Sequence, residues 1–145
     1  MESWKLAAFF AAVLYGLHNI FTKLASGRIS DQFGGFVLES TAAILILGYI
    51  VFAWLKGEHP VQYTKIGLLF SVFAGMSVAV GTILYFIVFR LGGHLSIAGP
   101  LILVGGSLFM ILAGIVFLHE KISFQTALGL LFGMVSLYLL SSGKG

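Results

Sequence analysis

Long apolar runs separated by short polar breaks dominate the chain. A membrane-spanning helix needs about 20 mostly apolar residues, and five runs reach that length. They cover residues 4–24, 33–55, 66–89, 95–118 and 122–140. Only helices or closed barrels satisfy the backbone in lipid, and these runs are too long and continuous for barrel strands. The pattern predicts an all-α integral membrane protein with five transmembrane helices.

The breaks between the runs carry glycine, proline and charged residues, which end helices. None is long enough to fold as a soluble domain, so we expect a single transmembrane domain over residues 1–145. The first run has only Lys5 at its flank. Its apolar stretch also exceeds the roughly 7–15 residues of a signal peptide. We therefore expect this run to remain as a helix.

Composition supports the same class. Of the 145 residues, 59% are apolar and 9% are charged, against about 45–50% and about 25% in soluble domains. The excess apolar surface must face lipid, which favours a multi-pass protein of the cell membrane (plasma or inner membrane). This composition excludes a disordered chain and a nucleic-acid binder. The chain has no cysteine, which excludes a disulfide scaffold, a thiol nucleophile and a cysteine-ligated metal site.

The basic residues give no orientation. An excess of lysine and arginine normally marks the cytoplasmic loops, but five crossings divide the eight basic residues equally. Four fall on the N-terminal side and four on the other: Lys5, Lys56, Lys65 and Lys121, against Lys23, Arg28, Arg90 and Lys144. One interpretation is dual topology, in which the chain inserts both ways and pairs with an inverted copy. The other is that eight charges are too few to show a bias.

Glu39 is the one acidic residue inside a predicted span. It lies six residues after Phe33, about 9 Å along a helix axis. A charge at the bilayer centre costs about 2.5–3.5 kcal/mol on insertion scales, so this side chain should face other helices or water. It could bind a proton, a cation or a cationic part of a substrate. Alternatively, it lies near the interface, where it reaches water or pairs with Lys23 or Arg28.

Several polar residues fall at a depth similar to that of Glu39, because successive helices run in opposite directions. Polar side chains buried in a membrane seek partners. We hypothesise a small polar pocket formed by His18, Asn19, Glu39, Ser40 and Tyr85, with Thr82 nearby. The alternative for Asn19, Ser40 and Thr82 is simple hydrogen bonding, either between helices or back to their own backbone. Pro100 lies early in the fourth span. It either opens that helix near a substrate site or lies near the first turn, where proline is tolerated.

Glycines and other small residues recur every four positions inside two spans. The third span has Gly67, Ser71 and Gly75, and the fifth has Gly129 and Gly133. Small residues on one stripe let helix backbones approach closely. We expect the third-span stripe to pack within the bundle. The fifth-span pair is expected to pack internally or to contact a second copy.

The polar residues do not form an enzyme site. Serine, histidine and acidic residues are scattered without the spacing of a nucleophile and its base. No cluster has metal-ligand spacing, and the Gly92-Gly93 pair lacks the lysine and hydroxyl residue of a phosphate-binding loop. We expect no enzymatic activity, no metal and no cofactor.

The last two runs carry a recognisable pattern, in the stretch LGGHLSIAGPLILVGGSLFMILAGIVFLHEKISFQTALGLLFGMVSLYLL. A helix rich in small residues precedes the turn Leu118-His119-Glu120-Lys121-Ile122-Ser123, and a helix with two glycines follows it. The first run adds LYGLHNIFTKLAS. Over almost its whole length the chain resembles the EamA-type branch of the drug/metabolite transporter superfamily. Many relatives have a proline in the middle of the fourth helix, where this chain has Gly105-Gly106.

The resemblance implies a transporter built from two inverted five-helix repeats, of which this chain supplies one. It implies a secondary carrier of a small metabolite that pairs with an inverted copy or a similar half-size partner. It also gives Glu120 a structural role, such as capping the fifth helix. Two alternatives remain open: a non-transporting subunit, for example of a complex handling a lipid-linked sugar, and a small multidrug exporter. Such exporters carry a glutamate in their first helix, where this chain has His18 and Asn19.

Overall fold

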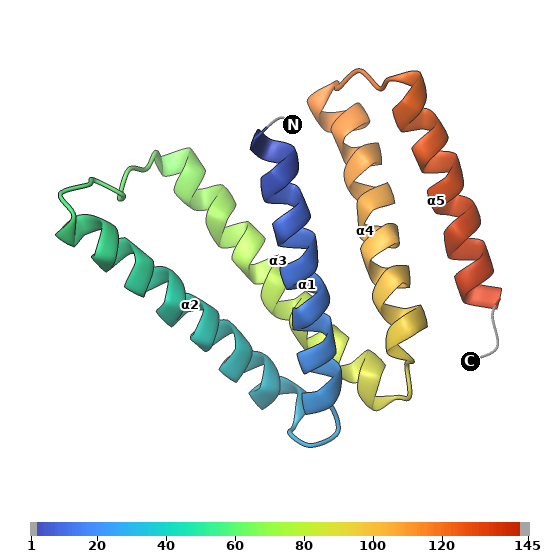
Figure 1. The fold of residues 1–145 in the computed structure, drawn as a ribbon, viewed down its shortest axis with the longest axis horizontal. Coiled ribbons are helices and arrows are strands. Elements are labelled where there is room, and N and C mark those ends of the chain that lie inside the picture. The colour runs from blue at the N-terminus through green and yellow to red at the C-terminus, as the bar shows by residue number, and fades with distance from the viewer. Residues whose placement is uncertain (1–2, 143–145) are drawn as a thin grey trace. The chain divides into compact units, whose positions relative to one another are not determined.

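Five long helices make up most of the chain. In a computed structural model, which describes residues 3–142, they are α1 (Ser3–Ala25), α2 (Asp31–Leu55), α3 (Lys65–Arg90), α4 (Leu95–Leu118) and α5 (Phe124–Ser142) (Figure 1). All five are long and apolar enough to cross a membrane. No helix end differs by more than two residues from its predicted position. The predicted class, an all-α membrane protein with five spanning helices, is confirmed.

The described residues form two compact units. One contains α2, α3 and the last turn of α1, over residues 21–91. The other contains residues 3–20 of α1 together with α4 and α5. Lys144, one of the charges in the orientation count, lies outside the described residues.

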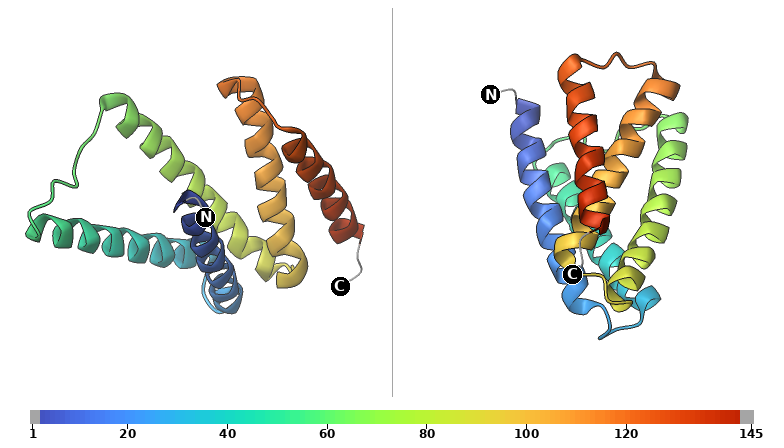
Figure 2. Two further views of the ribbon diagram at one scale, coloured as in Figure 1. Left: turned by 45° about the horizontal axis from the view of Figure 1, so that its top comes forward. Right: turned by 90° about the vertical axis from the view of Figure 1, so that its right-hand side faces the viewer.

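Within residues 21–91, α2 and α3 form an antiparallel hairpin that is closed at one end. The two helices lie together near Asp31 and Arg90 and diverge toward the loop at 56–64 (Figure 2). The exposure of α3 matches this divergence. Residues 65–80, in the part of α3 nearer the 56–64 loop, are all exposed. The buried residues of α3 are Thr82, Phe86 and Phe89, whose spacing of four and three puts them on one helix face.

A second antiparallel hairpin joins α4 to α5. His119 ends α4 in the left-handed conformation, at φ 52°, and the amide of Glu120 donates to the carbonyl of Gly114 at 3.0 Å. Ser123 caps α5, since its hydroxyl accepts from the amide of Thr126 at 3.1 Å. The Glu120 carboxylate lies instead over Gly114, with Oε2 2.7 Å from the point where a Cβ would stand. The expectation that Glu120 caps α5 is therefore wrong: it covers the end of α4.

The two small-residue stripes differ in their surroundings. Gly67, Ser71 and Gly75 are exposed, and a Cβ at Gly75 would meet nothing within 4 Å. The close packing predicted for this stripe is not found within residues 21–91. In α5, by contrast, a Cβ at Gly133 would lie 3.6 Å from Val104 Cγ1, whereas one at Gly129 would meet nothing within 4 Å. Gly133 thus packs against α4 within its own hairpin.

We expect Gly133→Leu to destabilise the α4–α5 hairpin by about 1–3 kcal/mol, because the larger side chain overfills the space beside Val104 and Leu108. The matched control is Gly129→Leu, one helical turn earlier, which we expect to leave stability unchanged. Thermal unfolding in detergent measures both. Equal melting temperatures for the two variants would mean that Gly133 is not in contact with α4.

Most large apolar side chains point outward. Residues such as Phe70, Phe109 and Phe132 are more than 60% exposed, while Ala53, Phe86, Phe89 and Ala98 are the buried apolar residues of the described chain. Such a surface is unstable in water, at about 25 cal/mol per Å² of exposed apolar area, and is the normal exterior of a protein in lipid.

Candidate functional site

Glu39 and Thr82 form a polar contact between α2 and α3. The hydroxyl of Thr82 donates to Oε1 of Glu39 at 2.5 Å. Thr82 is 8% exposed and Glu39 is half-buried. Because α2 starts at Asp31, Glu39 is the ninth residue of the helix and lies about 12 Å from its start. A carboxylate at this depth, hydrogen-bonded but not charge-neutralised, can accept a proton or attract a cation.

The alternative in which Glu39 pairs with a basic residue is wrong for the described residues, where Thr82 is its hydrogen-bond partner. Lys23 instead donates to the carbonyl of Phe89 at 3.3 Å and lies over the Phe89 ring. Within residues 21–91, the Glu39 carboxylate therefore has a hydroxyl donor and no basic partner. Two other predicted residues are close in sequence: Ser40 follows Glu39, and Tyr85 lies one turn beyond Thr82 with its ring against Phe89. Both are half-buried.

Asn19 and Pro100 come together in the other unit. Both line an open groove of about 260 Å³ between α1 and α4, with Gly16, Ile20, Leu95, Gly99 and Leu103. Asn19 is 5% exposed. Pro100 is the sixth residue of α4, and the helix continues through it to Leu118. Proline here removes a backbone donor without breaking the helix.

His18 faces a different surface from Asn19. It lines a shallow depression along α1 with Ala11, Leu14 and Tyr15, and its ring stands edge-on to that of Tyr15, with centroids 6.4 Å apart. The structure thus brings the predicted residues together as two pairs, Glu39 with Thr82 and Asn19 with Pro100, in separate units. The single pocket that would unite them stays a prediction.

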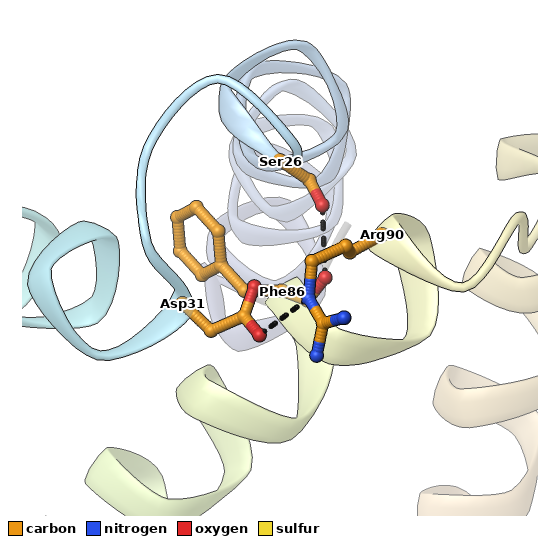
Figure 3. Close-up of polar contacts among 4 residues, drawn as sticks. All are labelled: Ser26, Asp31, Phe86 and Arg90. Carbon is orange, nitrogen blue, oxygen red and sulfur yellow. Dashed lines mark hydrogen bonds and ion pairs between the residues drawn. The ribbon is translucent and has the colours of Figure 1, made fainter.

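The closed end of the α2–α3 hairpin holds an ion pair that the sequence pattern did not predict. Arg90 Nε donates to Asp31 Oδ2 at 2.7 Å, and the Ser26 hydroxyl donates to the carbonyl of Phe86 at 2.8 Å (Figure 3). The Asp31 side chain is 7% exposed and that of Arg90 is 48% exposed. The other carboxylate oxygen of Asp31, Oδ1, is enclosed without a hydrogen-bond partner among the described residues.

The apolar pattern does not predict this ion pair, because Asp31 and Arg90 lie just outside the predicted spans 33–55 and 66–89. A signal existed: in an antiparallel hairpin the start of one helix meets the end of the next, so opposite charges at these two positions can pair. Within residues 3–142, no group of three or more histidine or acidic residues is arranged to hold a metal ion.

The family comparison covers nearly the whole chain. The profile of the EamA-like transporter family matches residues 2–142. The chain belongs to the EamA-like transporter family. No curated protein and no solved structure matches it.

EamA membership and the five apolar helices make the chain a multi-pass membrane protein and a membrane transporter of the drug/metabolite type. The family is one of transporters, and the expectation of no enzymatic activity stays a prediction. In this EamA-like chain, the two polar pairs are therefore candidates for contact with a transported molecule or ion.

Proposed function

We propose that the chain is a half-size secondary carrier that moves a small metabolite across the cell membrane, with Glu39 in its polar site. The observation that carries this proposal is the Glu39 carboxylate, held inside a spanning helix by Thr82 at 2.5 Å. A carboxylate at that depth is costly, and no basic side chain of its unit offsets the cost. In this proposal the carboxylate binds a proton or a cationic part of the substrate.

Counterflow in liposomes tests the proposal. Purified protein is reconstituted with an unlabelled compound inside and the labelled compound outside, using amino acids, sugar phosphates, nucleotide-linked compounds and cationic drugs in turn. A carrier gives saturable uptake for at least one class. If folded protein gives none with any class, the chain is a non-transporting subunit and the proposal is wrong.

We expect Glu39→Gln to lower the counterflow rate by about tenfold or more. The substitution keeps an oxygen acceptor for Thr82 but removes the charge that would bind a proton or a cationic part of the substrate. Hydrogen bonds to charged groups contribute about 1.5–3 kcal/mol. A loss of about 1.4 kcal/mol corresponds to a factor of ten. Thr41→Ala is the control, because Thr41 is exposed on the same helix and donates only to the carbonyl of Val37. Unchanged counterflow in the Glu39 variant would remove this residue from the site.

The carrier works as a pair in this proposal, either as an inverted homodimer or with a similar half-size partner. Support comes from the equal division of basic residues between the two faces and from the exposed stripe Gly67, Ser71 and Gly75 on α3. Transporters of inverted repeats place their sites at the repeat interface. A reporter fused to the C-terminus should then appear on both faces of the membrane. A reporter found on one face only rules out the inverted homodimer.

A further inference from the structure

The groove between α1 and α4 is shaped by residues that lack side-chain bulk. Gly16 on α1 and Gly99 on α4 both line it. A Cβ at Gly16 would meet nothing within 4 Å, and one at Gly99 would meet only Leu95 Cδ1, at 3.9 Å. A methyl group at either position would therefore meet at most an ordinary van der Waals contact. Helix packing does not require glycine at either position, and the absence of side chains there leaves the groove open.

One side chain of the groove wall is polar and forms no hydrogen bond within its own unit. Asn19 is 5% exposed, lines the groove and has no hydrogen-bond partner among the described residues. Leaving a buried polar group unpaired costs about 1–3 kcal/mol. A lipid chain cannot relieve that cost, because it has no donor or acceptor. A hydrogen-bonding group that enters the groove can.

Pro100, which also lines the groove, contributes no N–H to its wall. A proline has no N–H, so residue 100 cannot donate to the carbonyl of Ser96, four residues earlier. The remaining lining residues are glycine, leucine and isoleucine, and none is charged. The walls therefore suit a neutral group with an apolar body and disfavour an ion, which would lose its hydration without gaining a countercharge.

We propose that the α1–α4 groove binds a neutral hydrogen-bonding group of the transported molecule, a hydroxyl or an amide, through the side chain of Asn19. At about 260 Å³ the groove lies below the roughly 300–1,000 Å³ of pockets for whole ligands, so it receives one part of the molecule. The inference rests on the proposed carrier function and names the chemistry of part of its substrate. The apolar group next to that hydroxyl or amide contacts Leu95, Ile20 and Leu103.

The absence of cysteine from the chain permits a direct test with thiol reagents. Leu103→Cys places a single thiol in the groove. Leu101→Cys is the matched control, at a similar depth on α4 and outside the groove lining. In detergent, the rates of reaction with 2-hydroxyethyl and propyl methanethiosulfonate are compared at both sites. These reagents have similar length, and one ends in a hydroxyl while the other ends in a methyl group.

The ratio of the hydroxyethyl rate to the propyl rate should be roughly threefold to tenfold higher at Leu103→Cys than at Leu101→Cys. This difference corresponds to about one hydrogen bond between the hydroxyl of the reagent and Asn19. Adding Asn19→Leu to Leu103→Cys should return the ratio to the control value. The anionic 2-sulfonatoethyl reagent should react more slowly at Leu103→Cys than at Leu101→Cys. Equal ratios at the two sites, or a preference that persists without Asn19, would overturn the proposal.

Gly16→Phe provides a second arm, which does not depend on the Asn19 variant being folded. Filling the groove from α1 should slow all three reagents at Leu103→Cys by about fivefold or more and leave Leu101→Cys unchanged. Unslowed labelling at Leu103→Cys would also overturn the proposal. Because labelling does not require transport, a negative result here is distinct from a failure of counterflow, which would refute the carrier function itself.

Discussion

Replacing Arg90 by glutamine should destabilise the protein by about 3 kcal/mol, near the low end of the cost of breaking a buried ion pair. The Asp31 carboxylate is 7% exposed and would lose its one hydrogen-bonded cation. Its second oxygen, Oδ1, already has no partner among the described residues. The variant would therefore leave a charge buried and nearly uncompensated.

The reciprocal variant should cost much less. Asp31→Asn leaves the charge on Arg90, whose side chain is 48% exposed and can be hydrated, so we expect about 1 kcal/mol. The double variant should recover part of the loss caused by Arg90→Gln. Unfolding by denaturing detergent measures all three, with Arg28→Gln as the control because Arg28 is exposed. A larger loss for Asp31→Asn than for Arg90→Gln would contradict this explanation.

Gly34→Ala should cost about 1–3 kcal/mol, and Gly34→Leu more, because the position has no room for a side chain. A Cβ there would lie 2.6 Å from Phe86 Cε1, 2.8 Å from Phe86 Cζ and 3.1 Å from Ile29 Cγ2. Phe86 is 2% exposed and cannot swing outward without opening the closed end of the α2–α3 hairpin.

Gly48→Ala is the matched control on the same helix, since a Cβ at Gly48 would meet nothing within 4 Å. Thermal unfolding in detergent should separate the two alanine variants by several degrees. Combining Gly34→Ala with Phe86→Leu should recover part of the loss, because the shorter side chain frees the space. Equal stabilities for the Gly34 and Gly48 variants would mean that α2 and α3 do not approach each other at Gly34.

The five helices could be predicted because lipid imposes both their length and their composition. A span must be about 20 residues long and apolar throughout, so its limits can be read from the sequence. Helix ends are less constrained, and this explains the error at α2. The predicted span begins at residue 33, whereas the helix begins at Asp31, which pairs with Arg90.

The polar pairs were harder to predict than the helices. Depth along a helix places Glu39 and Thr82 at one level, and they do meet. Depth does not fix the direction in which a side chain points, so it grouped His18 with Asn19, which lines a different surface. A four-residue repeat has the same ambiguity. It marks a face that permits close approach, and it does not say whether another helix packs there, as at Gly133, or whether the face is left open, as at Gly75.

The most direct test of a half-size carrier is the dependence of counterflow on protein density. Vesicles are prepared at protein-to-lipid ratios that range from below one chain to several chains per vesicle. If two chains form one transport unit, the fraction of vesicles showing counterflow rises with the square of the ratio at low density. A linear rise from the lowest ratio would mean that one chain transports alone, and would contradict the account.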